Sequence, residues 1–112
     1  MNNKKLGMQW EQEFCKKLHN DGYWVHFITP DNRGAQPFDV IAVKDGIAAV
    51  YDCKTCVADT FNISRLEDNQ IMAFEKWLSC GNGEPHIAVL HDKKLYMISY
   101  LQLKQKGSVK LE

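Results

Sequence analysis

A tight turn between two apolar runs constrains the fold of this chain more than any other feature of its sequence. The runs, Phe38 to Val43 and Ile47 to about Thr55, are rich in the β-branched and aromatic residues that favour strands. Lys44-Asp45-Gly46 separates them, and an Asp-Gly pair between apolar runs is a strong hairpin signal. We therefore expect two antiparallel strands in which the start of the first lies beside the end of the second.

Helices are predicted on both sides of this hairpin. Apolar residues at every fourth position predict an amphipathic helix from about Leu6 to Asn20. The pattern Ser64-x-x-Glu67 matches a capping box and predicts a second helix that runs from there to about Leu78. Three further strands are predicted, over Tyr23–Ile28, Pro85–Leu90 and Leu95–Tyr100. The resulting order, α-β-β-β-α-β-β, indicates an α/β or α+β sheet with helices packed on it.

The composition is that of one globular domain. The 112 residues are 45% hydrophobic and 25% charged, so we expect a single domain over residues 1–112 with one packed core. No apolar run approaches the about 18 residues that cross a bilayer, and no apolar signal-peptide core follows the N-terminal lysines. These features predict a cytoplasmic protein without membrane attachment.

The formal net charge of zero argues against a nucleic-acid enzyme, because such proteins usually carry a basic surplus. A metal site would account for part of the acidic residues, since the bound cation neutralises their charge. Paired lysines along the chain could also form a local basic rim. The composition therefore leaves a nucleic-acid partner open.

The hairpin brings two aspartates and a lysine together. Side chains alternate along a strand, so Asp52 and Lys54 share one face and Cys53 points to the other. Asp39, at the open end of the hairpin, lies close to that pair. Neighbouring carboxylates repel unless a cation lies between them, and Mg²⁺ takes one or two carboxylates while keeping positions for water and phosphate oxygens. The pattern favours a metal site acting on phosphate; the alternative is a solvent-facing ion pair at a strand end.

These residues resemble a known signature. Pro37-Phe38-Asp39, followed across the hairpin by Asp52-Cys53-Lys54, is similar to the bipartite signature of the PD-(D/E)XK nuclease superfamily. Within it, the chain resembles Holliday-junction resolvases of the RecU and archaeal Hjc kinds and related phage nucleases, over roughly Gly7 to Leu101. The resemblance implies an α/β, restriction-endonuclease-like core with a central mixed sheet flanked by helices. It also implies a metal-dependent DNA endonuclease, plausibly a resolvase of Holliday junctions or other branched DNA.

The resemblance assigns roles residue by residue. Asp39 and Asp52 would be metal ligands, and Lys54 would orient the attacking water or the scissile phosphate. Glu11 would be a further metal ligand, direct or through water, and Gln70 would touch the site or the DNA backbone. The implied cofactor is Mg²⁺ (or Mn²⁺), with no nucleotide cofactor. The implied assembly is a homodimer whose two sites cut two strands.

Three other residues are candidate DNA contacts. Arg65 is predicted beside a capping serine at a helix N-terminus, where backbone N–H groups favour phosphate. Thr55 follows the lysine of the signature. Arg33 lies in the short segment Thr29–Pro37, where RecU-type resolvases carry a long protruding segment.

Several alternatives remain open at this stage. The chain could be a nuclease-fold module that binds DNA or protein without cutting, a restriction-type or repair nuclease for ordinary duplex DNA, or a small α/β binding domain. Cys53-x-x-Cys56 could also seed a zinc site, with His86 or His91 completing it.

Overall fold

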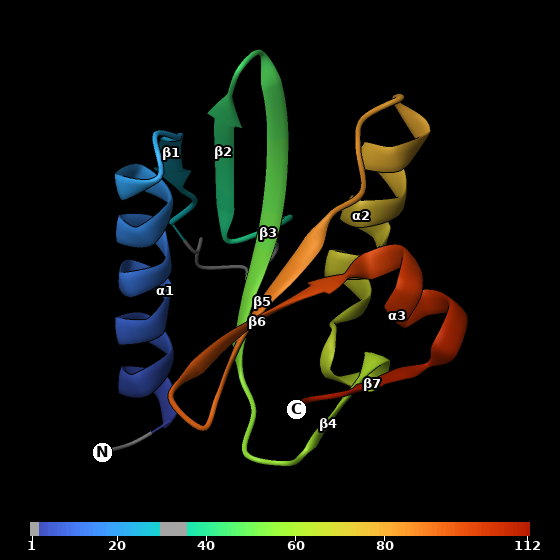
Figure 1. The fold of residues 1–112 in the computed structure, drawn as a ribbon. Coiled ribbons are helices and arrows are strands. Elements are labelled where there is room, and N and C mark those ends of the chain that lie inside the picture. The colour runs from blue at the N-terminus through green and yellow to red at the C-terminus, as the bar shows by residue number, and fades with distance from the viewer. Residues whose placement is uncertain (1–2, 30–35) are drawn as a thin grey trace.

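The computed structural model describes residues 3–29 and 36–112 (Figure 1). In chain order the elements are α1 (Asn3–Asn20), β1 (Trp24–Phe27), β2 (Val40–Lys44), β3 (Ile47–Thr55), β4 (Thr60–Asn62), the 3₁₀ turn η1 (Ile63–Arg65), α2 (Asp68–Ser79), β5 (His86–His91), β6 (Lys94–Ser99), α3 (Tyr100–Lys106) and β7 (Ser108–Lys110).

A five-stranded mixed sheet in the order β1-β2-β3-β5-β6 forms the centre of the fold. Neighbouring strands are antiparallel except β3 and β5, which are parallel. Parallel strands need a crossover connection, and α2 lies in the segment that joins β3 to β5. The predicted hairpin is confirmed, with Lys44 paired to Ile47 and Val40 paired to Tyr51.

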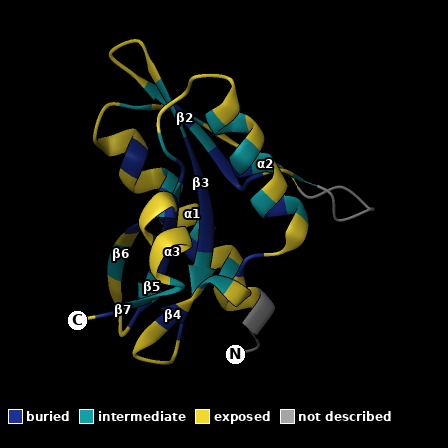
Figure 2. Ribbon diagram, turned by 90° about the vertical axis from the view of Figure 1, so that its right-hand side faces the viewer, coloured by how far each residue is buried: buried dark blue, intermediate teal, exposed yellow. Residues whose placement is uncertain are grey.

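The two faces of the sheet are covered by different elements (Figures 1 and 2). On one face α1 packs its apolar stripe against the strands, and Trp10 Nε1 donates a hydrogen bond of 3.0 Å to the carbonyl oxygen of Ala88. On the other face α2, α3 and the β4–β7 pair enclose a second core. The buried residues of that core include Phe38, Phe74 and Tyr100. The predicted mixed sheet flanked by helices is therefore confirmed.

The second helix begins later than predicted. Its N-cap is Glu67, and the capping box is formed by Glu67 with Gln70, not by Ser64 with Glu67. Leu66 explains the difference, because it is buried in the core with an extended backbone (φ −86°, ψ 136°) that no helix can run through. Ser64 lies instead in η1, where its backbone N–H donates to Asn62 Oδ1 at 2.9 Å.

The predicted order also omits three short elements, β4, α3 and β7. The predicted last strand ends at Ser99, whose Oγ accepts a hydrogen bond of 3.1 Å from the Gln102 backbone and caps α3. The chain then returns as β7, which pairs antiparallel with β4. Within the ranges that the structure describes, no helix is both long and apolar enough to cross a membrane.

Candidate active site

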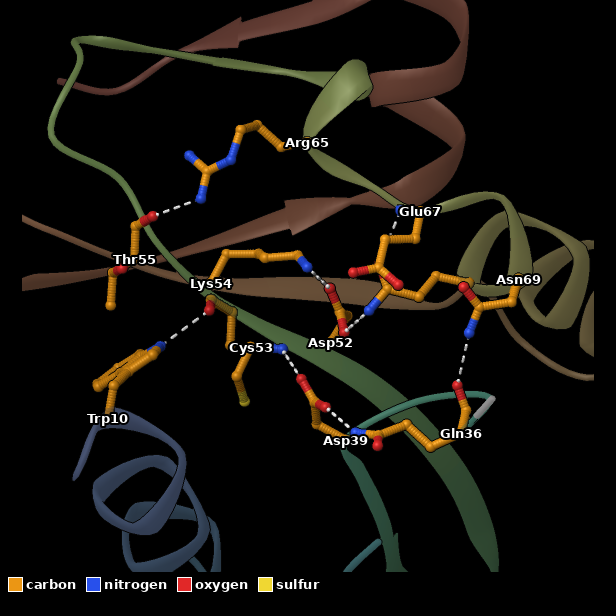
Figure 3. Close-up of polar contacts among 12 residues, drawn as sticks. Trp10, Gln36, Asp39, Asp52, Cys53, Lys54, Thr55, Arg65, Glu67 and Asn69 are labelled. Atoms are coloured by element: carbon orange, nitrogen blue, oxygen red, sulfur yellow. Dashed lines mark hydrogen bonds and ion pairs between the residues drawn. The ribbon is translucent and has the colours of Figure 1, made fainter. Parts of the chain in front are cut away.

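The two aspartates of the signature are buried side by side where the sheet is covered by α2. Asp39 immediately precedes β2, and its backbone N–H donates to the Tyr51 carbonyl oxygen at 3.0 Å, so it lies next to Asp52 on β3. Asp39 is 5% exposed and Asp52 is 0% exposed. The structure therefore brings Asp39, Asp52 and Lys54 together, as the hairpin predicts (Figure 3).

The two carboxylate oxygens of Asp52 differ in their hydrogen bonding among the described residues. Gln70 Nε2 donates to Asp52 Oδ1 at 2.7 Å. Asp52 Oδ2 accepts no hydrogen bond from any described residue, and Lys54 Nζ lies 3.4 Å from it. Burial, and then the charge of Asp39, raise the pKa of Asp52 well above its usual range, while Lys54 opposes the shift. A second positive charge at Oδ2 would therefore be stabilising.

Asp39 is held on both oxygens. The Cys53 backbone N–H donates to Oδ2 at 2.7 Å, and Gln36 Nε2 donates to Oδ1 at 2.9 Å. In Figure 3 both bonds converge on Asp39 from opposite sides. Two donors fix the plane of the carboxylate but leave each oxygen a further lone pair for another partner.

Glu11, on α1, is a further acidic residue that interacts electrostatically with this site. Its side chain is half-buried, and its pKa is raised to about 7, first by burial and second by the charge of Asp39. Lys54 partly opposes that shift. The predicted third ligand therefore interacts electrostatically with Asp39 and Lys54, although it comes from the other side of the sheet.

The donor set fits a hard divalent cation. Buried carboxylate oxygens, one of them without a hydrogen-bond partner among the described residues, are the ligands that Mg²⁺ prefers. Over residues 3–29 and 36–112, no group of three His, Cys, Asp or Glu side chains is gathered closely enough to hold a metal by itself. Asp39 and Asp52 would therefore supply the protein ligands, with Glu11 within electrostatic reach and substrate or water completing the shell.

The alternative of a zinc site is wrong for the Cys-x-x-Cys pair. Cys53 is buried against α1, whereas Cys56 belongs to the core on the α2 face of the sheet. Cys56 Sγ instead donates to the carbonyl oxygens of Ala58 and Thr60, at 3.4 and 3.7 Å. His91 forms a hydrogen bond through its Nδ1 with the Cys56 carbonyl oxygen, at 2.9 Å. The two thiols therefore do not converge.

The predicted DNA contacts differ in where the structure places them. Gln70 is 6% exposed, and its amide bonds Asp52 and the Glu67 backbone, so it touches the site. Arg65 is exposed but not at the start of a helix, because α2 begins only at Asp68; its Nη2 donates to the Thr55 carbonyl oxygen at 2.8 Å. Arg65 and Thr55 line one groove, whose lining does not include Lys54. Arg33 lies outside the described residues.

Sequence reasoning missed two residues near the site, Gln36 and Asn69. Gln36 bonds Asp39 through its side chain, and its own carbonyl oxygen accepts a hydrogen bond of 3.1 Å from Asn69 Nδ2. Asn69 precedes Gln70 at the start of α2. No spacing rule connects positions so far apart in the chain, so only the position of Gln36 near the signature could have drawn attention to it.

Comparisons with known proteins find one family model, a relative and a solved structure that are similar to this chain. The profile of the archaeal Holliday junction resolvase (Hjc) family matches residues 2–112. The crossover junction endodeoxyribonuclease Hjc of Methanocaldococcus jannaschii is 22% identical over 103 residues, 92% of this chain and 72% of that protein. The solved structure of Archaeoglobus fulgidus Hjc, a Holliday junction resolvase, is similar with a TM-score of 0.72 at 11% identity, over 93% of this chain and 83% of that one. At this identity the structural likeness establishes the fold alone.

Proposed function

This chain belongs to the archaeal Holliday junction resolvase family, and from that premise we propose that it is a divalent-cation-dependent endodeoxyribonuclease that hydrolyses phosphodiester bonds of branched DNA. The observation that carries the proposal is the buried pair Asp39 and Asp52 with Lys54 Nζ 3.4 Å from Asp52 Oδ2. An intact carboxylate pair beside a lysine favours this function over that of a nuclease-fold module that only binds.

The side chains divide the chemistry between them. When bound, a divalent cation supplies charge stabilisation for the phosphate and lowers the pKa of an attacking water. Asp39 and Asp52 would hold it, with Asp52 Oδ2 as the oxygen left open. Lys54, 18% exposed at its side chain, reaches the site from the same strand and would donate to the scissile phosphate or to the water. Water adds to phosphorus, the bond to the leaving oxygen breaks, and that oxygen takes up a proton.

Three finer points belong to the same proposal. The oxygen-only ligand set favours Mg²⁺, with Mn²⁺ as a substitute. Cleavage of two strands at a four-way junction favours a two-fold homodimer with one site per chain. All four cysteines are free thiols, which suits the reducing cytoplasm.

Cleavage of defined DNA substrates tests the proposal. The purified protein is incubated with labelled four-way junction, flap, single-stranded and linear duplex DNA, with EDTA, Mg²⁺ or Mn²⁺, beside Asp52→Ala and Lys54→Ala. We expect cation-dependent cleavage that prefers the junction and that both substitutions abolish. Cleavage of linear duplex at an equal rate would indicate a general nuclease, and no cleavage of any substrate would contradict the catalytic proposal. Light scattering of the same sample measures the oligomeric state.

A further inference from the structure

Adjacent residues in the first turn of α2 each reach one of the two buried aspartates. Gln70 does so directly, through its bond of 2.7 Å to Asp52 Oδ1. Asn69 does so through one intermediate: its Nδ2 donates to the Gln36 carbonyl oxygen at 3.1 Å, and Gln36 Nε2 donates to Asp39 Oδ1 at 2.9 Å. Figure 3 shows Asn69, Gln36 and Asp39 in this sequence.

The chain of bonds constrains Gln36 at both ends. Its side-chain amide is directed at Asp39, and its main chain is held by Asn69, so the donor cannot turn away unless one of the two bonds breaks. Groups that orient a metal-ligating carboxylate tune the affinity of the site without touching the metal. The first turn of α2 therefore holds Asp39 and Asp52 relative to each other.

We propose that Asn69 and Gln36 are positioning residues, which act as a relay from α2 to Asp39 and set its orientation for cation binding. The inference rests on the proposed function, because it assigns these residues to the same site. It extends to two positions that the signature does not include.

Residues other than Asn69 stabilise the fold around its contact with Gln36. Glu67 and Gln70 form the capping box of α2 without Asn69. Phe38 anchors the segment before Asp39 to the helix, with its ring stacked on Phe74 at 6.0 Å and edge-on to Trp77 at 5.8 Å. The loss of the Asn69 side chain should therefore leave the helix and the hairpin in place.

The chain offers a matched control at the other end of the helix. Asn82 Nδ2 donates to the Trp77 carbonyl oxygen at 3.1 Å, the same kind of bond at the same length. Asn69→Ala and Asn82→Ala each remove one hydrogen bond from a side-chain amide to a main-chain carbonyl oxygen. The Asn69 bond is partly buried and lies near the site, whereas the Asn82 bond is exposed and lies far from it. Asn69→Asp adds a variant that favours the helix, since an acidic residue in the first turn is stabilising, yet a carboxylate cannot donate to Gln36. Gln36→Met keeps the main chain of position 36 and a side chain of similar length, but it removes the amide that donates to Asp39.

Two readouts are measured for each variant: the rise in melting temperature on titration with Mn²⁺ alone, which reports binding to the folded state, and the Mn²⁺ concentration that gives half-maximal junction cleavage. For Asn69→Ala and Asn69→Asp we expect that concentration to rise about 3- to 10-fold, with a smaller thermal shift. Gln36→Met should have a larger effect, because it removes the donor to Asp39 itself, and Asn82→Ala should match the unsubstituted protein. Junction affinity in EDTA should be unchanged in Asn69→Ala, which alters no charge.

The outcomes separate this inference from the proposed function. If the unsubstituted protein binds Mn²⁺ and cleaves, and the Asn69 variants match Asn82→Ala in both readouts, the relay is overturned and the proposed function stands. If the unsubstituted protein neither cleaves nor responds to Mn²⁺, the proposed function is contradicted. The relay is then contradicted as well, because it rests on that function. In the double variant Asn69→Ala with Gln36→Met, effects no larger than those of Gln36→Met alone support the relay, and full additivity contradicts it.

Discussion

The backbone N–H of Cys53 donates a hydrogen bond of 2.7 Å to Asp39 Oδ2. The strand that carries Asp52 and Lys54 therefore holds the other aspartate through its main chain, whatever the side chain at position 53. The Cys53 side chain lies on the opposite face, where burial and then the nearby Asp39 raise the pKa of its thiol and keep it protonated.

This geometry predicts that Cys53→Ala leaves cleavage intact. The variant keeps the backbone donor and removes only a small buried side chain, so we expect a cleavage rate within about two-fold and a loss of about 1 kcal/mol in the free energy of unfolding. Junction cleavage and urea unfolding measure the two quantities. A loss of cleavage at unchanged stability would mean that the thiol itself takes part in the reaction.

Asp52→Asn should abolish cleavage and stabilise the protein in EDTA. Burial and the charge of Asp39 disfavour the ionised form of Asp52; asparagine removes the charge and keeps an oxygen that can accept from Gln70. We expect a gain of about 0.5–2 kcal/mol, as for other stabilising substitutions at functional sites. Thermal unfolding at pH 8 in EDTA measures the gain, with Glu75→Gln as control, because Glu75 is ion-paired with Lys104 at 3.0 Å and its pKa is lowered. A destabilised Asp52→Asn would contradict this account of the site.

The raised pKa of Glu11 predicts that the free energy of unfolding depends on pH, and it fixes the sign of that dependence. The folded protein holds this proton up to about pH 7, whereas the unfolded chain releases it near the ordinary value of 4.5. Between these values the unfolded state binds fewer protons, so the contribution of Glu11 to stability falls as the pH rises. Glutamine does not ionise, so in Glu11→Gln this fall in stability with rising pH is absent.

We therefore expect Glu11→Gln to match the unsubstituted protein in EDTA at pH 4 and to be more stable at pH 8. Because the side chain is only half-buried, solvent screening limits the gain to about 1 kcal/mol. Denaturant unfolding at both pH values measures it. Junction cleavage by the same variant tests the ligand role that the family resemblance predicts for Glu11, because a fall in cleavage is expected only if Glu11 contributes to cation binding. An equal effect of the substitution at both pH values would show that Glu11 ionises as an ordinary surface group.

The parts of the site that follow from local rules could be predicted from the sequence. The Asp-Gly turn and the alternation of side chains in strands are enough to place Asp39 near Asp52 and Lys54. Glu11 and Gln70 depend on a family resemblance, since the chain alone does not say how α1 and α2 lie on the sheet. Their roles, like those of the signature residues, stay predictions until cleavage is measured.

The parts that were missed depend on tertiary contacts. The bond between Asn69 and Gln36 joins positions 33 residues apart. The helix α3, of 7 residues, and the strand β7, of 3, are too short to leave a periodic pattern. They exist because Tyr100 and Leu103 are buried and because Gly107 ends α3 in a left-handed conformation (φ 80°).

Substitution of Arg65 tests DNA binding separately from DNA cleavage. Its guanidinium is held by the Thr55 carbonyl oxygen at 2.8 Å and by the ring of Phe61, 5.5 Å away, and Arg65 lines a surface groove. A phosphate held there would release one counterion on binding. Arg65→Ala should therefore weaken binding to every DNA substrate and reduce the salt dependence of binding by about one unit of slope.

Fluorescence anisotropy in EDTA over a range of salt concentrations measures both the affinity and its salt dependence. Lys76→Ala, near the far end of α2, is the control. An unchanged slope would show that the phosphate backbone does not reach this groove.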